Sequence, residues 1–244
     1  MTTLRVLTWN VLHRVHGVNW AEACLRAFPD ERVRSERIAA RVARWLAGGI
    51  DAVCLQEVSG DQLAVLRGLV GGSVFVQRAP RTPRFRAEGQ TPLVDASELL
   101  VTIAARSDAK LLEGRAYEND QGKGLLAVEA APGCLVLNTH VTHGAPGLAQ
   151  LSQLRALASG APSAVVLGDF NAPLDVVTRA LGEGFVVADV SGQGPTRVAS
   201  PDNPAGKVID HVVVWRGNAS EAHVLQGEGL SDHHPVSATI DLDA

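Results

Sequence analysis

Short apolar runs alternate with polar and glycine-containing segments along the whole chain. Runs of four to eight apolar residues bounded by turn-forming residues are typical of buried β-strands. On this basis the sequence predicts strands at residues 4–9, 51–56, 73–77, 99–104, 124–129, 135–139, 164–167, 208–214 and 236–240.

Other segments show helical spacing instead. Within residues 30–47 the apolar residues Val33, Ile38 and Val42 recur on one helical face, and Gly48 follows as a stop signal. Three further helices are predicted at residues 61–69, 147–157 and 174–181. No linker or low-complexity stretch divides the chain, so we expect a single α/β (α+β) domain over residues 1–244.

Composition narrows the class of protein. Of 244 residues, 46% are hydrophobic and 20% are charged, which is close to the average for globular proteins. The start, MTTLRVLTWN, lacks the features of a signal peptide, and no apolar run is long enough to span a membrane. The three cysteines are scattered, which argues against a disulfide framework or a thiolate zinc site. We therefore expect a cytoplasmic protein with no membrane span and no obligate protein partner.

Charge is informative mainly where it is clustered. The net charge of −4 argues against a general nucleic-acid binder. Six arginines lie within residues 26–44, where a solvated helix face is the simplest interpretation. Four more lie in the stretch RAPRTPRFR at residues 78–86, which we predict to be a loop able to contact a phosphate backbone.

Polar residues stand where predicted strands end. Burying a carboxylate, amide or imidazole at such a position is unfavourable unless the group is paired or binds a metal. Five strands share this feature, through Asn10, Glu57, His140, Asp169 with Asn171, and Asp210. Because strand ends in α/β proteins commonly carry functional sites, the sequence predicts one site built from these residues.

The residue types indicate the chemistry of that site. Oxygen ligands from Glu57, Asp232 and Asn10 suit a hard cation such as Mg²⁺, which also binds substrate phosphate. Imidazoles beside carboxylates suit acid–base catalysis or stabilisation of a charged transition state. Since no cysteine belongs to the set, a thiolate nucleophile is disfavoured.

Six motifs occur in a recognisable order, TWN, LQE, NTH, GDFN, IDH and SDHHP. Together they resemble the endonuclease/exonuclease/phosphatase superfamily, which has the deoxyribonuclease I-like fold, and they cover the chain from Asn10 to Pro235. The resemblance implies a four-layer α/β sandwich, with two mixed β-sheets packed face to face and helices on the outside.

The resemblance also implies a set of metal ligands. Glu57 of LQE corresponds to the principal Mg²⁺ ligand, and Asn10 of TWN would bind or position the metal and its waters. Asp232 of SDH corresponds to a carboxylate on the metal side. Mn²⁺ is the expected substitute ion.

Catalytic roles carry over in the same way. Asp169 of GDFN would orient or activate the attacking water, and Asn171 would hold a phosphate oxygen. His140 of NTH would contact the phosphate or assist the leaving group. His233 would contact the scissile phosphate as a base or an electrostatic stabiliser, and Asp210 of IDH would accept a hydrogen bond from it.

Two further residues match the family pattern less specifically. Glu98 stands where family members have a carboxylate that pairs with the first histidine, so it would orient His140. Lys123 stands at the position of a basic phosphate contact. An exposed loop charge is the alternative interpretation of both residues.

The segment HRVHGVNW, which follows Asn10, lies beside the expected metal. It contains three candidate substrate contacts, His13, Arg14 and His16. A simple turn is an equally good interpretation of this segment.

In SDHHP, two adjacent histidines cannot face the same side of a strand. The family register selects His233 as the functional imidazole. His234 should therefore point away from the site, and His211 after Asp210 should likewise be structural.

The function implied is a Mg²⁺-dependent phosphoesterase that hydrolyses a phosphodiester or phosphomonoester by direct attack of water. A nuclease or nucleotide phosphodiesterase is favoured, although scarce aromatic residues leave few platforms for stacking bases. The alternatives are a phosphatase or phosphodiesterase for inositol phosphates or lipid-type substrates, and a catalytically inactive binding module. A zinc hydrolase is disfavoured, because the histidine pairs do not share one helix face.

Overall fold

The computed structural model describes residues 2–200 and 203–242, and two six-stranded sheets form its centre. The first sheet has the strand order β11-β12-β1-β2-β4-β3. Its strands are β1 (Thr2–Asn10), β2 (Ala52–Ser59), β3 (Ser73–Arg78), β4 (Glu98–Ala104), β11 (Gly217–Val224) and β12 (Val236–Leu242).

The second sheet has the order β5-β6-β7-β8-β10-β9. Its strands are β5 (Lys110–Tyr117), β6 (Asp120–Ala131), β7 (Cys134–His140), β8 (Ser163–Asp169), β9 (Phe185–Val187) and β10 (Asp210–Trp215). Each sheet contains one parallel pair, β1–β2 and β7–β8, and its other strand pairs are antiparallel.

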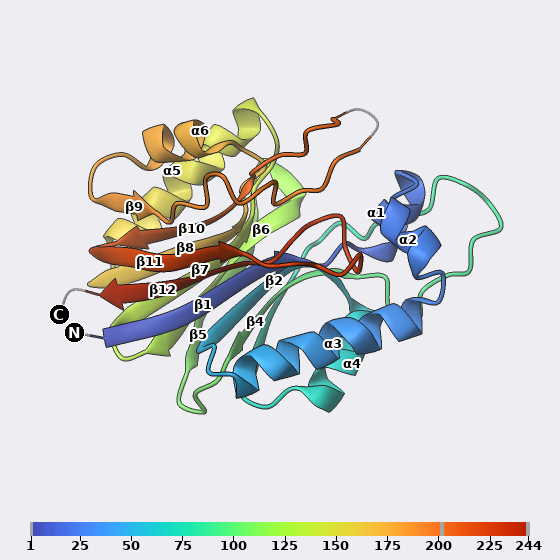
Figure 1. The fold of residues 1–244 in the computed structure, drawn as a ribbon, viewed down its shortest axis with the longest axis horizontal. Helices are drawn as coiled ribbons and strands as arrows, with labels where there is room; N and C mark the ends of the chain where they lie inside the picture. The colour runs from blue at the N-terminus through green and yellow to red at the C-terminus, as the bar shows by residue number, and fades with distance from the viewer. Residues whose placement is uncertain (1, 201–202, 243–244) are drawn as a thin grey trace.

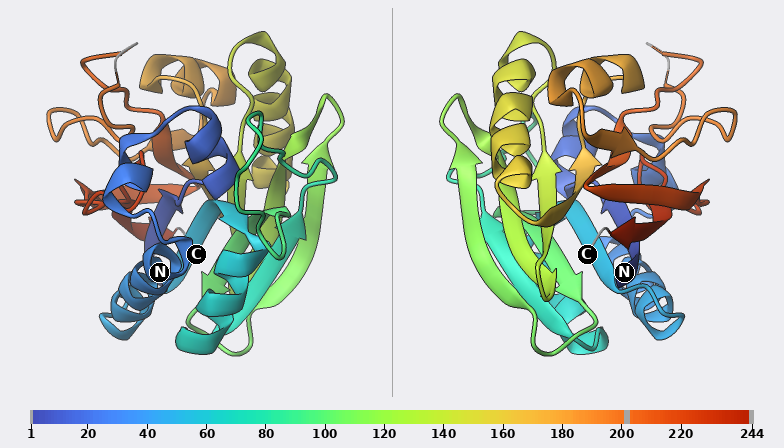
Figure 2. Two further views of the ribbon diagram at one scale, coloured as in Figure 1. Left: turned by 90° about the vertical axis from the view of Figure 1, so that its right-hand side faces the viewer. Right: turned by 90° about the vertical axis from the view of Figure 1, so that its left-hand side faces the viewer.

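Helices cover the outer faces of both sheets (Figure 1 and Figure 2). The helices α3 (Glu31–Ala47) and α4 (Gly60–Leu69) pack on the first sheet, and α5 (Ala145–Ser159) and α6 (Leu174–Leu181) pack on the second. This arrangement confirms the predicted four-layer α/β sandwich. Within the described ranges, no helix is long and apolar enough to cross a membrane.

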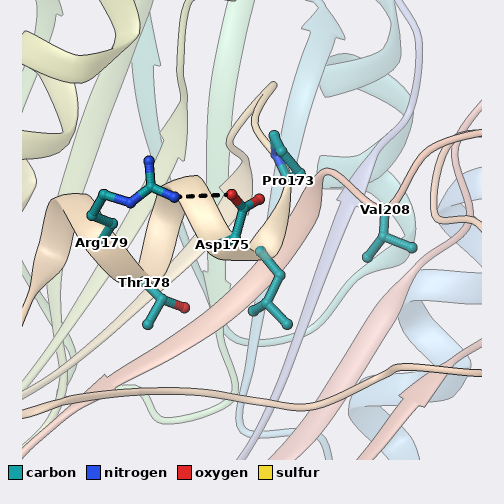
Figure 3. A pocket seen from close by; sticks show the side chains of 6 residues that line it. Pro173, Asp175, Thr178, Arg179 and Val208 are labelled. Carbon is teal, nitrogen blue, oxygen red and sulfur yellow. Dashed lines mark hydrogen bonds and ion pairs between the residues drawn. The ribbon is translucent and has the colours of Figure 1, made fainter.

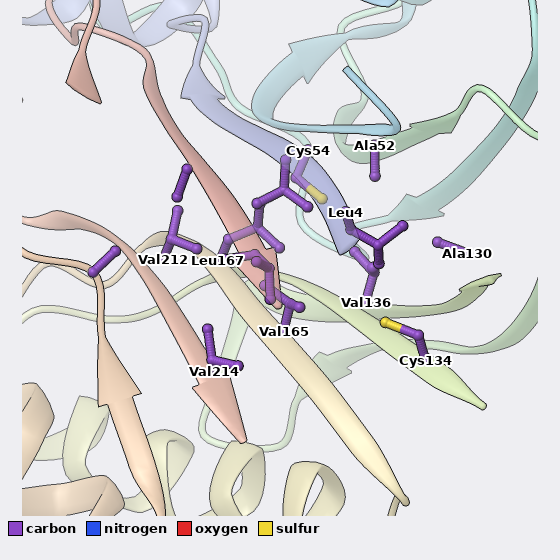
Figure 4. Packing of buried hydrophobic residues seen from close by; sticks show 14 of the residues in the cluster. Leu4, Ala52, Cys54, Ala130, Cys134, Val136, Val165, Leu167, Val212 and Val214 are labelled. Carbon is purple, nitrogen blue, oxygen red and sulfur yellow. The ribbon is translucent and has the colours of Figure 1, made fainter. Parts of the chain in front are cut away.

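Consecutive apolar residues of the central strands enter different cores, because side chains along a strand point to opposite faces. In β8, Val165 and Leu167 enter the core between the two sheets, which Figure 4 shows. Val166 enters the core beneath α5 and α6. A strand buried on both faces reads as an unbroken apolar run, and for this reason the sequence predicted these strands well.

The elements that the sequence did not predict are short or lie at edges. The strands β5 and β11 lie at sheet edges and are largely exposed, so they lack a continuous apolar run. The segment after Asn10 was expected to be a loop or turn, but it contains the short helices α1 (Arg14–Asn19) and α2 (Ala23–Ala27). The predicted strand at 208–214 begins only at Asp210.

The expectation of a solvated arginine face on α3 was wrong for two of its arginines. Arg34 is completely buried, and only 9% of the surface of Arg41 is exposed. The guanidinium of Arg34 is satisfied by backbone carbonyls and by Glu31 at 2.7 Å, which makes burial of its charge tolerable.

The parallel pairs place the motif residues at one end of the sandwich. Asn10 ends β1, while His140 and Asp169 are paired at the ends of β7 and β8. The two chain ends lie at the opposite end of the sandwich (Figure 1), and the left view of Figure 2 faces the end that carries the motifs.

Candidate active site

A buried imidazole–carboxylate pair forms the centre of the site. Nδ1 of His233 lies 2.8 Å from Oδ2 of Asp210, so the predicted hydrogen bond is present. Burial alone would lower the pKa of His233, but the carboxylates of Asp210, Asp232 and Asp169 outweigh this effect and raise it to about 10. The imidazole is therefore positively charged at neutral pH.

Asp169 lies on the other side of this imidazole. Its Oδ2 is 3.8 Å from Nε2 of His233 and 3.4 Å from Nε2 of His140. Burial favours the neutral acid, yet the two imidazoles outweigh it and hold the pKa of Asp169 far below its usual range. The preceding Gly168 is required because a Cβ there would lie 1.9 Å from the carbonyl oxygen of Thr139 on β7.

Asn10 connects the two sheets through its amide. Its Nδ2 donates to Oδ2 of Asp169 at 3.1 Å and to Oε1 of Glu57 at 3.2 Å. Its Oδ1 accepts from the backbone N–H of Leu12 at 3.0 Å, which fixes the orientation of the amide. The backbone N–H of His13 donates to Oε2 of Glu57 at 3.2 Å, so the turn after β1 orients both side chains.

Glu57 is aimed into the site by an irregularity in β2. The sequence placed it after a strand, but β2 continues to Ser59, and its register with β4 shifts between Leu55 and Val58. Glu57 has a φ of 55°, a left-handed backbone conformation that is unfavourable for a residue with a Cβ. Such bulges commonly redirect side chains beside active sites.

His140 lies between an amide and an ammonium group. Nζ of Lys123 is 3.0 Å from its Nδ1, and Nδ2 of Asn171 is 3.3 Å from its Nε2. Nε2 of His140 is also 3.8 Å from Oε1 of Glu57. These three donor-bearing side chains, His140, Asn171 and Lys123, together form a place that suits an anionic group.

Asp232 has a partner that sequence reasoning missed. Its Oδ2 lies 3.3 Å from both Nε and Nη2 of Arg197, whose Nη2 also lies 3.1 Å from Glu22. Arg197 belongs to no predicted element or motif, and only its place opposite Asp232 in the folded chain identifies it.

The carboxylate and imidazole groups of the site are suited to binding a divalent cation. Two groups of side chains bring ligand atoms within 4.8 Å of one another, Glu57 with Glu98 and His140, and Asp169 with Asp210 and His233. Burial raises the pKa of Glu57, but His16, Lys123 and His140 outweigh this effect and hold the carboxyl ionised. Ionised oxygen donors in a buried setting fit a hard divalent cation. Asp232, predicted as a metal ligand, belongs to neither group.

Residues 7–233 match the family model described as the Endonuclease/Exonuclease/phosphatase family. The chain belongs to this family. Its members are phosphoesterase hydrolases that use divalent metal ions. Among curated protein sequences, none matches the chain significantly.

Solved structures support the same fold. An endonuclease/exonuclease/phosphatase from Beutenbergia cavernae DSM 12333 is similar with a TM-score of 0.69 and 22% identity, over 100% of this chain and 72% of that chain. The human Nocturnin catalytic domain with bound sulfate anion has a TM-score of 0.65 and 18% identity, over 99% and 95%. D. rerio TDP2 complexed with single strand DNA product has a TM-score of 0.65 and 12% identity, over 99% and 100%.

In this family member, the predicted partnership of Glu98 with His140 is replaced by another. Oε2 of Glu98 lies 3.2 Å from Nε2 of His16 on α1. Lys123 instead contacts His140, so it lies beside an active-site imidazole rather than in an exposed loop. The sequence did flag His16, but its pairing with Glu98 depends on a helix that the apolar pattern did not predict.

The other two candidates from that segment have structural contacts. His13 is buried, and its Nδ1 accepts from the backbone N–H of Val15 as the N-cap of α1. Nη1 of Arg14 lies 3.6 Å from Glu31. These contacts orient both side chains within α1 and toward α3, and a contact of either residue with substrate stays a prediction.

Two hydroxyl groups, of Ser231 and Thr196, position the segments that carry His233 and Asp210. Oγ of Ser231 donates to the carbonyl oxygen of Asn10 at 2.7 Å and accepts from the N–H of His233 at 3.1 Å. Oγ1 of Thr196 accepts from the N–H groups of Ile209 and Asp210 at 3.0 and 3.1 Å. These short polar contacts position Asp210 and His233 relative to β1.

His234 and His211, which the sequence predicted to be structural, both contact backbone groups. Nδ1 of His234 accepts from the N–H of Gly227 at 3.0 Å. Nε2 of His211 lies 2.9 Å from the carbonyl oxygen of Ala172, and its ring packs against Phe170.

An open hollow of about 720 Å³ lies at the start of α6, beside the segments that carry Asn171 and Asp210 (Figure 3). It is lined by Pro173, Leu174, Asp175, Thr178, Arg179 and Val208. Asp175 and Arg179 form an exposed ion pair at 3.2 Å across one helical turn, which contributes little to stability. The candidate residues His233, Asp169 and Glu57 are not among those that line this hollow.

Proposed function

We propose that the protein is a Mg²⁺-dependent phosphoesterase that hydrolyses a phosphodiester or phosphomonoester by direct attack of water, with nucleic acid or a nucleotide as the preferred substrate class. The observation that carries the proposal is the meeting of two ionised carboxylates, the partly buried Glu57 and the buried Asp169, with two imidazoles, His140 and His233. This combination can hold a divalent cation and stabilise negative charge on a phosphate group, as metal-assisted phosphate-ester hydrolysis requires.

The charge of each side chain indicates its role in hydrolysis. His233, held as a cation by Asp210, would donate to a non-bridging phosphate oxygen and stabilise the charge that develops there. Asp169 is too weak a base to retain a proton, so it would orient the attacking water by accepting a hydrogen bond. Asn171, His140 and Lys123 would hold the phosphate in line with that water.

A divalent cation would be held by Glu57, with Asn10 positioning that carboxylate, and we propose Mg²⁺ with Mn²⁺ as a substitute. When bound, the ion supplies Lewis-acid stabilisation of negative charge on the phosphate and leaving oxygens. In the hydrolysis itself, the new bond forms between the water oxygen and phosphorus while the bond from phosphorus to the leaving oxygen breaks. The water gives up one proton as its oxygen bonds to phosphorus and the leaving oxygen takes one up, so the net proton transfer is from water to the leaving oxygen, and no covalent enzyme intermediate forms.

Two structural neighbours favour the substrate class. Nocturnin binds a sulfate anion, and TDP2 is seen with a single strand DNA product. Both folds therefore accommodate tetrahedral oxyanions or their nucleic-acid esters. We infer that the donors around His140 would bind such an anionic group in this chain.

The test uses the protein freed of metal with EDTA and resupplied with Mg²⁺, Mn²⁺ or Zn²⁺. Substrates are single-stranded and duplex DNA, RNA, nucleotides, inositol phosphates and sphingomyelin. We expect hydrolysis of nucleic acid or nucleotides with Mg²⁺ or Mn²⁺, and its loss in Glu57→Gln. Absence of hydrolysis on every substrate, or full activity in Glu57→Gln, would overturn the proposal.

A second readout does not depend on turnover. Mg²⁺ should raise the melting temperature of the parent protein, because an ion that binds only the folded state stabilises it. The same Mg²⁺ concentration should stabilise Glu57→Gln much less.

A further inference from the structure

An exposed tryptophan stands where α1 ends. The side chain of Trp20 is 63% exposed, whereas Trp9 is completely buried. The guanidinium of Arg86 lies 4.5 Å from the Trp20 ring centre, so one face of the indole is covered by a cation. An open aromatic face next to a cation is the combination on which single-stranded nucleic acids stack their bases.

The loop that carries Arg86 is attached to α1 by the side chain of Asn19. Nδ2 of Asn19 donates to the carbonyl oxygen of Arg84 at 2.9 Å, and its Oδ1 accepts from the N–H of Arg86 at 2.9 Å. This pair of hydrogen bonds holds the arginine-rich loop against α1. The indole and the guanidinium are thus preorganised rather than meeting by chance.

The helix connects this surface to the catalytic residues. His16, one turn before Trp20, lies on Glu98 in the group that includes Glu57 and His140. Residues four apart on a helix are neighbours on the same side, and the N–H of Trp20 bonds to the carbonyl of His16 at 2.9 Å. Trp20 therefore lies about one helical turn outward from the catalytic group.

The arginine-rich loop at residues 78–86 also begins beside the catalytic group. Ala79, near its start, lines a water-sized cavity together with Glu57, Glu98 and His140. Six residues later along the chain the loop reaches Phe85, followed by Arg86 above the indole. Two short segments, α1 and the loop from Ala79 to Arg86, therefore both lead from the site to Trp20. We call the surface along them the rim.

Basic side chains mark this rim. Lys123 contacts His140, and the adjacent Gly122 is covered by the guanidinium of Arg81, since a Cβ on Gly122 would lie 2.1 Å from Nη2. Arg81 is ion-paired with Asp120 at 3.5 Å yet remains 60% exposed. Positive charge thus continues from the catalytic imidazole toward the loop that carries Arg86, as a polyanion requires.

We propose that Trp20, Arg86, Arg81 and Lys123 form a binding track for single-stranded nucleic acid, which we call the Trp20 track. Trp20 would stack an unpaired base next to the scissile phosphate, while the basic side chains contact the flanking phosphates. Stacking on an aromatic ring favours single strands, because the bases of a duplex already stack on one another. This inference rests on the proposed function and assigns its substrate class.

Binding can be measured without hydrolysis. Fluorescein-labelled dT and U 12-mers and a duplex 12-mer are titrated with the protein in EDTA at low salt, and anisotropy is recorded. We expect the single strands to bind more tightly than the duplex, and Trp20→Ala to weaken that binding by about tenfold. Arg86→Ala and Arg81→Ala should weaken it less and reduce its salt dependence.

The chain offers a matched control. Arg216 lies over the ring of Trp215 at 5.5 Å, and Trp215 ends the strand whose first residue is Asp210, at the opposite end of the sheet. Arg216→Ala therefore removes a similar cation–aromatic contact far from the site, and single-strand binding should match the parent. Trp20→Phe, which keeps an aromatic face, should recover part of the affinity lost in Trp20→Ala.

The outcomes separate this inference from the proposed function. Parent-like single-strand affinity in Trp20→Ala and Arg86→Ala overturns the Trp20 track, even where the protein hydrolyses phosphate esters. Loss of binding to phosphatidylglycerol vesicles in Trp20→Ala, with 12-mer binding unchanged, overturns it in favour of a membrane contact. Selective single-strand binding by a protein that hydrolyses nothing supports the track and overturns only the proposed function.

Discussion

Nη2 of Arg34 lies 2.7 Å from the carbonyl oxygen of Leu12, a residue with a left-handed φ of 58°. The same guanidinium donates through Nη1 to the carbonyls of Val11 and Leu230, both at 2.8 Å. A single buried side chain on α3 thus ties together the loop that follows Asn10 and the loop that precedes the SDHHP motif. The Leu12 turn in particular directs N–H groups to Asn10 and Glu57.

We therefore predict that Arg34→Lys lowers turnover as well as stability. Lysine keeps the charge but cannot reach three carbonyls and Glu31 at once. The free energy of unfolding should fall by about 3 kcal/mol, and turnover of the folded protein by roughly 10- to 100-fold. Urea denaturation and steady-state kinetics with varied Mg²⁺ measure the two effects.

Arg41→Lys is the control for this prediction. Arg41 lies two turns further along α3 and binds the carbonyl of Gln226 and the carboxylate of Glu228, both at 2.6 Å. It should lose stability but keep turnover and Mg²⁺ dependence. Equal losses of turnover in the two variants would show that the effect of Arg34 is not specific to its loop contacts, and unchanged turnover in Arg34→Lys would show that Arg34 acts only on stability.

The two adjacent histidines should differ sharply. His233→Gln removes the charged imidazole beside Asp169 and should lower turnover by at least about 100-fold. His234→Gln removes only an acceptor for the N–H of Gly227 and should leave turnover close to the parent value. Activity assays on both variants show which histidine acts in the site. Loss of turnover in His234→Gln but not in His233→Gln would mean that His234, and not His233, is the functional imidazole.

The Asp210–His233 pair should make stability depend on pH. Because the folded pKa of His233 is raised to about 10, from about 6.5 in the unfolded chain, the pair stabilises the fold fully below pH 6.5. This contribution is lost as pH rises toward 10. The melting temperatures of the parent and Asp210→Asn should therefore differ most near pH 6 and converge at alkaline pH, and a constant difference would contradict the assignment.

A buried amide contact between the sheets should be important for stability. Nε2 of Gln56 donates to Oδ1 of Asn138 at 2.8 Å, and Nδ2 of Asn138 donates to the carbonyls of Leu55 and Val101. Gln56→Leu should lower the free energy of unfolding by about 1–3 kcal/mol, because Asn138 loses a partner in a buried place.

A double-mutant cycle checks this contact. Gln56→Leu and Asn138→Leu combined should destabilise less than the sum of the single changes, measured by urea denaturation. Strict additivity would mean that the two amides are energetically independent.

The local pattern of apolar and polar residues was sufficient to predict the strands that are buried on both faces. The unbroken apolar runs of β7, β8 and β10 identified strands buried on both faces, and polar residues at or next to strand ends identified Asn10, Glu57, His140 and Asp169 as neighbours. Such features depend on the alternation of side chains along one strand, which neighbouring residues determine.

Contacts between distant segments could not be predicted in this way. Arg34 reads as one of five arginines on an exposed helix at residues 30–47, yet its contact with Leu230 spans 196 positions. Arg197 has no motif, and the pairing of Glu98 with His16 requires the short helix α1. The sequence by itself determined the buried strands and the chemical types at their ends. Only the tertiary structure decided which buried charge meets which partner, because that choice depends on the packing of helices and loops around the two sheets.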